Sequence, residues 1–581
     1  MFKTQQFDKA LDEYFSKLAL DEKGGQWRTC RFSGEKFYVR PEDIEFYKKI
    51  RVPLPTLSPA ERWRRMLAYH NVHNLFYVKS AFSGERIIAA YPPDTPFKVF
   101  EHQIWFSDKW DPFAFGRPWD TTKVFFDQFK ELRTIVPRPN LVTDTTNTGS
   151  EYTNTSTHLK NCYLTFSTIS GENLYYFDCC DGCTDCVDCE GLWNSNTCYQ
   201  SQILYDSYRC FYCEQSRGCL ESNFLFDCRN CQNCFMSSNL RNKKYYFRNQ
   251  QLSKEEYEQK IQQEVYLGSF AHLQNYLKEF TDLKRNAYYK PDNNFRAVNS
   301  YGDFIDNSRN CYWCNYIVEC DNVNYSEGVG YYKDSYDIVG GAGGELCYEL
   351  VTLSTANNFG AKLSSQIDNC RDVEYCDLCR NCHDCFGCIG LANKSFCIFN
   401  RQYTEEEYWR VVDQIKTSML AAWEYGELFP PELAPVPYKL SLISSYPGFR
   451  DFEQAASYGY DTSEVPIQKS EVAGDIVSAG SLPDDIKDVD DGILQKIIFD
   501  EKNNKYFRLT KYEFDFYRRH CLALPREHPL KRLERFREVY DLRMSFYDET
   551  CRKCGVPIKT VHNPAHYKNN YCEPCYQNSL T

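Results

Sequence analysis

The sequence lacks the short motifs that many hydrolases and nucleotide-using enzymes carry. No GxxxxGK[ST], HExxH or GxSxG pattern occurs in its 581 residues, and it contains only 10 His. A phosphate-binding loop, a zincin helix and a nucleophile elbow each require one of these patterns, because the chemistry depends on that spacing. The sequence therefore predicts a protein that is not an enzyme.

Long apolar runs are also missing. No stretch of ~20 apolar residues occurs, so we expect no membrane-spanning segment. The first twenty residues contain acidic side chains and no apolar core of the kind found in secretory signals. These features predict a cytoplasmic protein without a membrane partner. In that reducing compartment we expect the 30 cysteines to be metal ligands or buried thiols before disulfides.

Acidic residues outnumber basic ones except at one end of the chain. The net charge is −12, but residues 501–581 alone carry +6, which leaves −18 for the rest. A basic tail on an acidic body points to an anionic partner for the tail, although a solvated surface of mixed charge gives the same balance.

The cysteines that are present fall into separate groups. Thirteen lie within 162–234, eleven within 311–397 and four within 551–575, while Cys30 and Cys521 stand alone. In the first group, steps of 12 from Cys162 meet Cys at five of seven positions, and the half-steps carry small or apolar residues. This period is too short for a repeat built from helical hairpins.

A 12-residue period fits a parallel β-solenoid, in which one position of each coil stacks on the same position of the next. Because side chains alternate along a strand, we expect the Cys to point inward and the following aromatic residue to point outward. The outward row would include Tyr163, Tyr199, Phe211 and Phe235. Whether one coil holds one 12-residue unit or two stays open.

The second group repeats this scheme with an interruption. The 12-residue step holds to Cys347 and resumes at Ala361 after a slip of two residues, and the Gly-rich run at 340–344 predicts a tight corner or bulge. Both groups close with a similar segment that leads into a capping box, Ser253 with Glu256 and Thr404 with Glu407. We expect helices at about 253–284 and 404–425 to cover the ends of the arrays.

The last four cysteines have the spacing of a metal site, C-x2-C-x17-C-x2-C. Two CxxC knuckles joined by a hairpin supply four thiolates, which is the requirement of a closed structural Zn²⁺ site. The predicted ligands of this single zinc ion are Cys551, Cys554, Cys572 and Cys575. His562 and His566 lie in the intervening loop, and since four ligands are already present we expect both at the surface.

The two ends of the chain are related to each other. At an offset of 470, residues 46–65 align with 516–535, and at 471 residues 84–105 align with 555–576. The N-terminal region nevertheless lacks a set of four cysteines, and we expect two ribbon-like units without metal within 26–110, with Cys30 as a buried thiol. Their knuckle positions are Cys30, Ser33, Ser58 and Glu61 in one unit and Ser80, Ser83, Glu101 and Ile104 in the other.

The predicted fold class is mainly β with helical caps: two Cys-rich parallel β-solenoid arrays flanked by zinc-ribbon-like end modules. The expected organisation is an N-terminal helix (1–25), paired metal-free ribbons (26–110), a connector (111–150), the first solenoid (151–250), a helical cap (251–300), the second solenoid (301–400), a second cap (401–428), a Pro- and Ser-rich linker (429–495) and a C-terminal helix with the zinc ribbon (496–581).

The chain resembles a bacterial family of uncharacterised Cys-rich repeat proteins with a C-terminal zinc ribbon. The resemblance rests on the segment at 46–65, the Cys-rich arrays, the LRNKKYYF closure of the first array and the terminal CxxC pair. It implies zinc binding by the four C-terminal cysteines and brings no established activity.

These features favour a non-catalytic, zinc-binding scaffold that presents solenoid surfaces to a macromolecular partner, a protein rather than a nucleic acid. Two alternatives stay open. The basic tail, with Lys531, Arg532, Arg535 and Arg537 on one expected helix, would suit nucleic-acid or ribosome binding. The CxxCxxCxxC run from Cys180 would suit an iron–sulfur or thiol-redox protein. The sequence does not indicate the oligomeric state.

Overall fold

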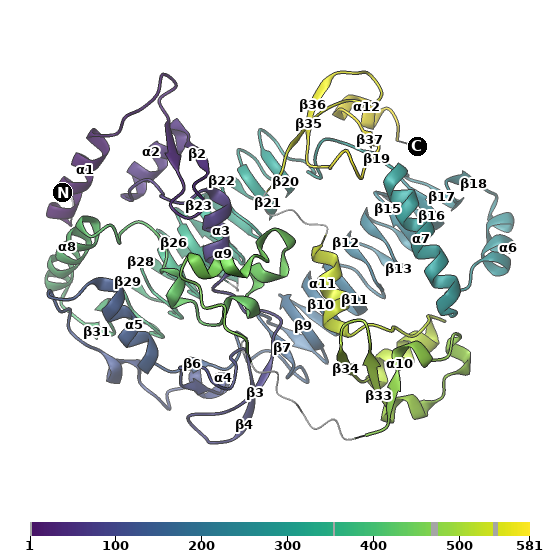
Figure 1. Ribbon diagram of the computed structural model, residues 1–581, viewed down its shortest axis with the longest axis horizontal. Helices are drawn as coiled ribbons and strands as arrows, with labels where there is room; N and C mark the ends of the chain where they lie inside the picture. Colours follow the sequence, from purple (N-terminus) through teal and green to yellow (C-terminus); the bar gives the residue numbers. More distant parts are fainter. Residues whose placement is uncertain (1–2, 144, 353–354, 466–473, 539–543, 581) are drawn as a thin grey trace. The chain divides into compact units, whose positions relative to one another are not determined.

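The computed structural model describes residues 3–143, 145–352, 355–465, 474–538 and 544–580. The protein is mainly β with additional helices, as the sequence predicts (Figure 1). The chain divides into two compact units. Unit 1 contains residues 1–145, 293–465 and 541–544, and unit 2 contains 146–292, 466–540 and 545–581. Each unit therefore combines one Cys-rich array with the end module from the far end of the chain.

The first array, in unit 2, is a 12-stranded sheet whose neighbouring strands are parallel except at its closing edge. Paired residues lie 12 apart along the chain: Leu174 pairs with Cys186, and Gln232 pairs with Lys244. One turn of the chain therefore takes 12 residues. The strands are β7 Thr153–Asn154, β8 Leu159–Lys160, β9 Tyr163–Thr168, β10 Gly171–Asp181, β11 Cys183–Trp193, β12 Gln202–Tyr205, β13 Tyr208–Phe211, β14 Glu214–Arg217, β15 Leu220–Phe226, β16 Gln232–Ser238, β17 Lys244–Phe247 and β18 Gln250–Gln251.

Within each turn, every third residue points inward. Cys180, Cys183, Cys186 and Cys189 are all at most 3% exposed, and the following positions of this series continue the core of the array. The residue before each of them has a positive φ, for example 53° at Asp185. Left-handed residues bend the chain sharply, so each turn has four corners and four inward side chains. The CxxCxxCxxC run is therefore the lining of one turn, and its true period is three residues.

Many of the inward residues also accept hydrogen bonds from the backbone. The backbone N–H of Cys213 donates to Oγ of Ser201 (3.0 Å), and that of Cys198 donates to Sγ of Cys186 (3.3 Å), in each case one turn earlier. A buried N–H without a partner is costly, and an aliphatic side chain offers no acceptor. Small side chains with an oxygen or sulfur satisfy both the space and the donor, which explains why Ser and Cys replace one another inside the array.

The second array, in unit 1, repeats this arrangement with the predicted slip. Ile338 pairs with Leu350 at a step of 12, Leu350 pairs with Ser364 at 14, and Val373 pairs with Cys385 at 12 again. The register also shifts within the Gly-rich run, so the predicted bulge is confirmed. The strands are β20 Tyr301–Asp306, β21 Tyr312–Val318, β22 Asp321–Asn324, β23 Gly330–Val339, β24 Ala342–Glu345, β25 Tyr348–Val351, β26 Thr355–Phe359, β27 Lys362–Ser365, β28 Arg371–Glu374, β29 His383–Phe386, β30 Ser395–Ile398 and β31 Arg401–Gln402.

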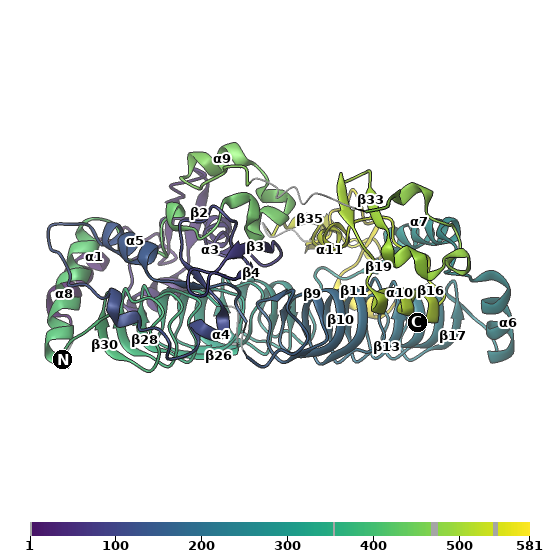
Figure 2. The same cartoon turned by 90° about the horizontal axis from the view of Figure 1, so that it is seen from below.

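Helices follow both arrays, as the capping boxes predict. Both boxes are formed, at Ser253 before α6 (Lys254–Glu264) and at Thr404 before α8 (Glu405–Ala421). In Figure 2, α6 lies beyond the last strands of the first array and α8 beyond those of the second. The expected single helix at 253–284 is instead two, because the chain breaks before α7 (Phe270–Asn286), which packs along the side of the array on Phe224 and Phe235.

The two end modules share one order of elements. The N-terminal module has β1 Gln26–Thr29, β2 Lys36–Val39, α2 Pro41–Ile50, α3 Pro59–Leu67, β3 Phe76–Lys79, β4 Arg86–Ala89 and α4 His102–Trp105. The C-terminal module has β33 Ile497–Asp500, β34 Lys505–Phe507, α10 Lys511–Arg519, α11 Pro529–Arg537, β35 Tyr547–Thr550, β36 Pro557–Thr560 and α12 Glu573–Gln577. The N-terminal module lies on the second array, and the C-terminal module lies on the first array.

The aromatic row is expected to form an exposed contact surface. This expectation is wrong for three of the four residues named for the row, and Tyr163 is half-buried. Tyr199, Phe211 and Phe235 are at most 5% exposed. Tyr199 packs against Tyr517 of α10, with ring centroids 5.6 Å apart, while α7 covers Phe235. Burying aromatic rings against each other is more favourable than leaving them in water, so the row serves as a docking surface within the unit.

Both modules dock through buried charges at equivalent positions. Arg62 of α3 pairs with Asp337 (2.7 Å) in unit 1, and Arg532 of α11 pairs with Asp188 (3.1 Å) in unit 2. All four side chains are at most 2% exposed. Such pairs replace hydration that burial removes, so losing one partner is expected to be costly.

The segment 429–495 differs from the extended linker that its composition predicts. Its described part contains short 3₁₀ helices such as 431–433 and 442–445 and the helix α9 (Phe452–Ser457). Tyr438, Ile443 and Phe449 are buried. In unit 1 the guanidinium of Arg64, in the N-terminal module, lies over the ring of Phe449; the last described residues of the segment lie in unit 2, where β32 (Ile476–Ser478) pairs with β33.

Candidate metal centre

The first knuckle of the C-terminal ribbon is a tight turn that begins where β35 ends. The N–H of Cys551 donates to the carbonyl of Val556 (2.8 Å), and the N–H of Gly555 donates back to Cys551 (2.8 Å). Gly555 has φ +77°, a conformation that glycine adopts without strain. This turn places the thiols of Cys551 and Cys554 on one side of the hairpin.

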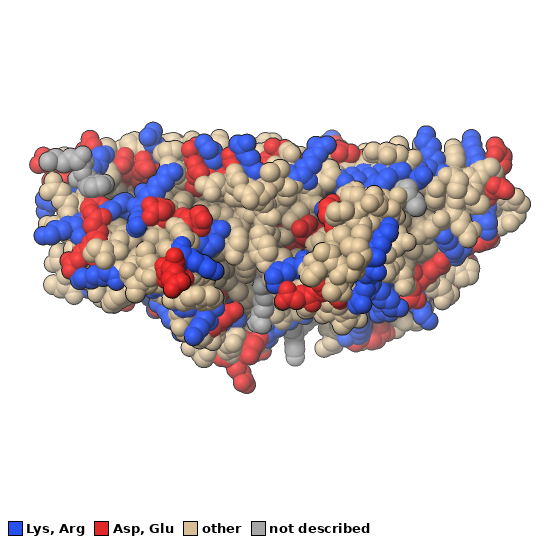
Figure 3. Space-filling view, turned by 90° about the horizontal axis from the view of Figure 1, so that it is seen from above, with Lys and Arg blue, Asp and Glu red and all other residues tan. Residues whose placement is uncertain are grey.

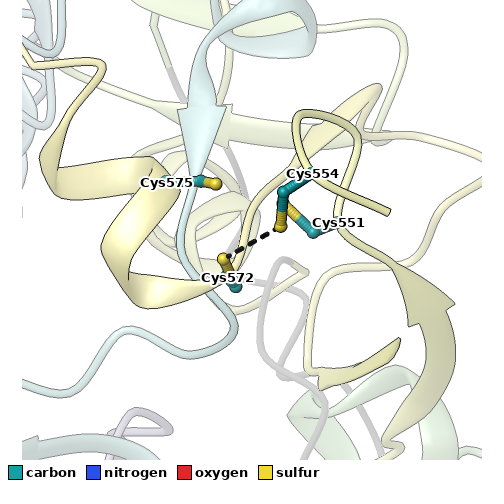
Figure 4. A group of neighbouring side chains, drawn as sticks. All are labelled: Cys551, Cys554, Cys572 and Cys575. Atoms are coloured by element: carbon teal, nitrogen blue, oxygen red, sulfur yellow. Dashed lines mark hydrogen bonds between the residues drawn. The ribbon is translucent and has the colours of Figure 1, made fainter. Parts of the chain in front are cut away.

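The second knuckle is the start of a helix. Cys572 is the N-cap of α12, and Cys575 lies in its first turn, after Pro574. The N–H of Arg552 donates to the carbonyl of Asn570 (3.0 Å), which holds the two knuckles against each other. Figure 4 shows the four cysteine side chains, two from each knuckle, directed toward a common point.

The sulfur positions are compatible with a tetrahedral site. All four Sγ atoms lie within 4.8 Å of one another, and those of Cys554 and Cys572 are 3.7 Å apart. A zinc ion with Zn–S bonds of about 2.3 Å requires sulfur–sulfur separations of about 3.8 Å. The structure thus brings the four predicted residues together in a group that could hold a metal ion, and no comparable group of His, Cys, Asp and Glu occurs elsewhere in the described residues.

The surroundings of the group favour a thiolate at Cys551. Burial raises the pKa of this thiol, but backbone N–H groups of Cys572, Cys554 and Lys553 outweigh it and lower the pKa to about 6. Cys551 is buried, Cys554 is exposed, and the other two cysteines are half-buried. Tyr576, which follows Cys575, donates its hydroxyl proton to Asp227 and thereby connects the ribbon to the first array.

In the second N-terminal ribbon, hydrogen bonds stand where the metal ligands would be. Oγ of Ser80 donates to Glu101 Oε2 (2.6 Å), and Ser83 donates to Oε1 of the same carboxylate. The knuckle keeps its N–H donors, because Phe82 and Ser83 donate to Oγ of Ser80. One carboxylate therefore bridges the two serines, and Ile104 contributes no polar atom.

The first N-terminal ribbon retains one cysteine. Cys30 is 1% exposed, as predicted, and hydrogen bonds from Ser33 and from the N–H of Ser58 lower the pKa of its thiol against the effect of burial. The fourth position, Glu61, forms an ion pair with Arg64 (2.9 Å). One thiol and one engaged carboxylate do not make a cage of four ligands.

A fourth ribbon, β33–β34, contains no cysteine, so the cysteine spacing of the sequence does not predict it. Asp500 takes the place of Cys30, and its carboxylate accepts the N–H of Asn503 (3.1 Å) and of His528 (2.8 Å). Asn504 has φ 51°, where Gly34 has φ 71°. The offset of 470 between the two ends is the signal in the sequence that could reveal this ribbon. It aligns Asp500, Asn503, Asn504 and His528 with Cys30, Ser33, Gly34 and Ser58 of the first N-terminal ribbon.

The two loop histidines have different environments. His566 is exposed, as predicted. His562 is only 6% exposed and packs against Tyr289 of unit 2, with ring centroids 4.6 Å apart, so its expected surface position is wrong. Burial lowers the pKa of His562 to about 3. The loop that contains His562 packs on β19 (Tyr288–Tyr289) through the rings of His562 and Tyr567, and this packing cannot be inferred from the loop sequence.

The basic helix proposed for phosphate contact is engaged within unit 2. Arg532 and Arg537 of α11 are buried, the first beside Asp188 and the second hydrogen-bonded to Asp178. Lys531 pairs with Glu534, and Arg535 pairs with Glu527 (2.9 Å). Arg532 and Arg537 thus hold the module on the array, whereas Lys531 and Arg535 pair with acids of the module itself.

The chain matches no protein-family model, and no curated protein matches it. Among the described helices, none is both long and apolar enough to cross a membrane.

Proposed function

We propose that the four C-terminal cysteines bind one structural Zn²⁺ and that the chain is a non-catalytic scaffold. The observation that carries the metal assignment is the convergence of four Sγ atoms within 4.8 Å. Four protein thiolates complete a tetrahedral shell, so no position is left for a catalytic water. The family resemblance, the cytoplasmic location and the assignment of zinc over other thiophilic metals are parts of the same proposal.

The scaffold we propose consists of two β-solenoids. Parallel pairing at a step of 12, with four corners per turn, supports a continuous coil in each array. Each coil is stabilised by its neighbours and carries long rows of side chains on its outside. Such rows offer extended contact surface without any catalytic group.

The outward rows that no module covers are the contact surfaces in this proposal. In the first array, the uncovered row includes Tyr208 and Leu220, which are 45% and 38% exposed. In the second array, the row carries charges that alternate in sign, with Arg309 beside Asp321 (2.7 Å). Acidic and basic side chains are also mixed on the face drawn in Figure 3. Mixed charge with exposed aromatic side chains suits a protein partner better than a polyanion.

Metal analysis tests the first part. Protein purified without oxygen should contain about one zinc per chain and no iron. Substitution Cys572→Ser should remove the zinc, whereas Cys382→Ser, which changes an interior thiol of the second array, should not. Brown protein with several irons per chain would favour the iron–sulfur alternative instead.

Cross-linking tests the second part. A photoreactive group placed at Tyr208 in the full chain should join a protein partner in the native extract. The matched control carries the same group at Tyr506, which is equally exposed but lies on the C-terminal module. Equal labelling from both sites would contradict a partner at the uncovered row. Cross-links to RNA that disappear at high salt would favour the nucleic-acid alternative.

A further inference from the structure

A small cavity lies in unit 1 where the N-terminal module meets the second array. Its volume is about 30 Å³, and its wall contains apolar side chains such as Leu378 and Val436 together with the polar residues His70, Arg138 and Gln366. A cavity needs roughly 10–15 Å³ to hold one water molecule. This one therefore has room for a ligand of a few heavy atoms.

Beside the cavity, two buried arginines share one carboxylate. Arg138 Nη1 lies 2.8 Å and Arg133 Nε 3.4 Å from the same oxygen, Oδ2 of Asp377. All three side chains are at most 3% exposed, and within the described residues neither arginine has an ion pair with another acid. The cluster thus holds one positive charge more than it neutralises.

An uncompensated charge away from water is costly, and proteins normally pair it. The structure reflects that cost, because burial and the neighbouring Arg138 lower the pKa of Arg133. Of the Arg138 guanidinium, Nε donates to the hydroxyl of Tyr91 (3.0 Å) and Nη1 to Asp377, while Nη2 donates to no described protein atom. Arg138 is the arginine that lines the cavity.

His70 supplies the second observation. It is 2% exposed, yet neither ring nitrogen has a hydrogen-bond partner in the described part of the chain. Burial lowers the pKa of His70 to about 3, so the ring is neutral at pH 7 and carries one N–H donor. A buried ring with both nitrogens unsatisfied at a cavity wall indicates that something in the cavity bonds to it.

We propose that this cavity binds a small monovalent anion, a halide or a planar oxyanion such as nitrate, bicarbonate or formate. The anion would neutralise the excess charge of the arginine cluster. Arg138 and the imidazole N–H of His70 would donate to it, and the amide of Gln366 would close the polar side. A cation would be repelled by the excess positive charge of the arginine cluster, and a neutral ligand would leave that charge unbalanced. The charge of the cluster therefore selects an anion, and the volume of the cavity excludes large ones.

Thermal unfolding of the full chain in different sodium salts tests this proposal. Replacing gluconate, which is too large for the cavity, by chloride or nitrate at constant ionic strength should raise the unfolding midpoint of unit 1 in a saturable way. Substitution Gln366→Leu or His70→Leu should reduce the rise, and His383→Leu, at an exposed histidine of the same unit, should leave it unchanged. A rise that does not saturate, or that both pocket variants retain in full, would overturn the proposal.

Crystals soaked in bromide give a direct reading. Anomalous density between His70 and Arg138 is the expected result, and its absence at a concentration that saturates the midpoint shift would count against the site. Because Gln366 is partly exposed at the wall, its variant is expected to fold even if His70→Leu does not, and the comparison keeps its meaning.

Discussion

The docking of the N-terminal module on the second array offers a test with a calculable size. Arg62 donates from Nε to Asp337 (2.7 Å) and from Nη1 to the carbonyl of Leu57 (3.0 Å), and both charged side chains are at most 2% exposed. Substitution Arg62→Met leaves a carboxylate buried without its cation. Breaking a buried pair in this way costs about 3–5 kcal/mol.

The cost should depend on pH. In the intact pair, burial raises the pKa of Asp337 to about 6, and Arg62 opposes this rise. Without Arg62 the folded-state pKa rises further above the unfolded value of about 3.9. A carboxyl group whose pKa is higher in the folded than in the unfolded state stabilises the fold at low pH. This stabilisation is lost as pH rises from the unfolded to the folded pKa, by about 1.4 kcal/mol per pH unit. The variant should therefore be less destabilised at pH 5 than at pH 8.

Native-state hydrogen exchange of α3 and β23 is the suitable assay, because a chain of two units need not unfold in one step. The matched control is Arg309→Met, which breaks an exposed pair with Asp321 (2.7 Å, arginine 67% exposed) and should cost less than about 1 kcal/mol. The double variant Arg62→Met/Asp337→Leu should recover most of the loss, because an apolar pair can replace a buried ion pair. If Arg62→Met costs no more than the control, or if the double variant is as unstable as the single one, the reasoning about buried docking charges is wrong.

Three further predictions concern the metal, the hydrogen bonds that replace it in other ribbons, and stability in acid. Removal of zinc by a chelator should lower the local stability of the C-terminal ribbon by a free energy of the order of 10 kcal/mol. Amides of β35–β36 should then exchange rapidly while those of β10–β11 stay protected, and equal loss of protection in both would show that the array needs the metal. Substitution Glu101→Leu leaves the buried Ser80 hydroxyl without its acceptor and should destabilise the β3–β4 hairpin by about 1–3 kcal/mol, as measured by hydrogen exchange against the exposed control Glu85→Leu. The pKa of His562 is about 3 in the folded state and about 6.5 in the unfolded state, so the contribution of His562 to the free energy of unfolding is present above pH 6.5 and is lost as pH falls, by about 2 kcal/mol at pH 5. Substitution His562→Gln should therefore make the unfolding midpoint of unit 2 less dependent on pH, and an unchanged slope would contradict this prediction.

The internal duplication of the chain explains why its two ends look alike. Asp43 accepts the hydroxyl proton of Tyr325 in unit 1 (2.6 Å), and Glu513 accepts that of Tyr176 in unit 2 (2.6 Å). Four ribbons in the described part of the chain have a residue with positive φ at the knuckle (Gly34, Gly84, Asn504 and Gly555), and only the last ribbon retains four cysteines. In the three others, hydrogen bonds to Glu101, Cys30 and Asp500 hold the turns that a metal would otherwise hold.

The sequence alone determined the features that depend on local spacing. The 12-residue step, the slip after Cys347, the capping boxes at Ser253 and Thr404, and the grouping of the four C-terminal cysteines all appear in the structure. Each follows from neighbours along the chain or from a repeat that stacks on itself, so no knowledge of distant segments is needed.

Tertiary structure decided what covers what. Tyr199 and Phe211 are suited to an exposed contact surface until α10, more than 300 residues away in the sequence, packs over them. The sequence predicts His562 at the surface, but in the structure it packs against Tyr289 of β19. The sequence likewise offers Arg532 for phosphate contact, but in the structure Arg532 is paired with Asp188. Burial and charge pairing depend on contacts between distant segments, and a single sequence carries no record of which of its compatible surfaces meet.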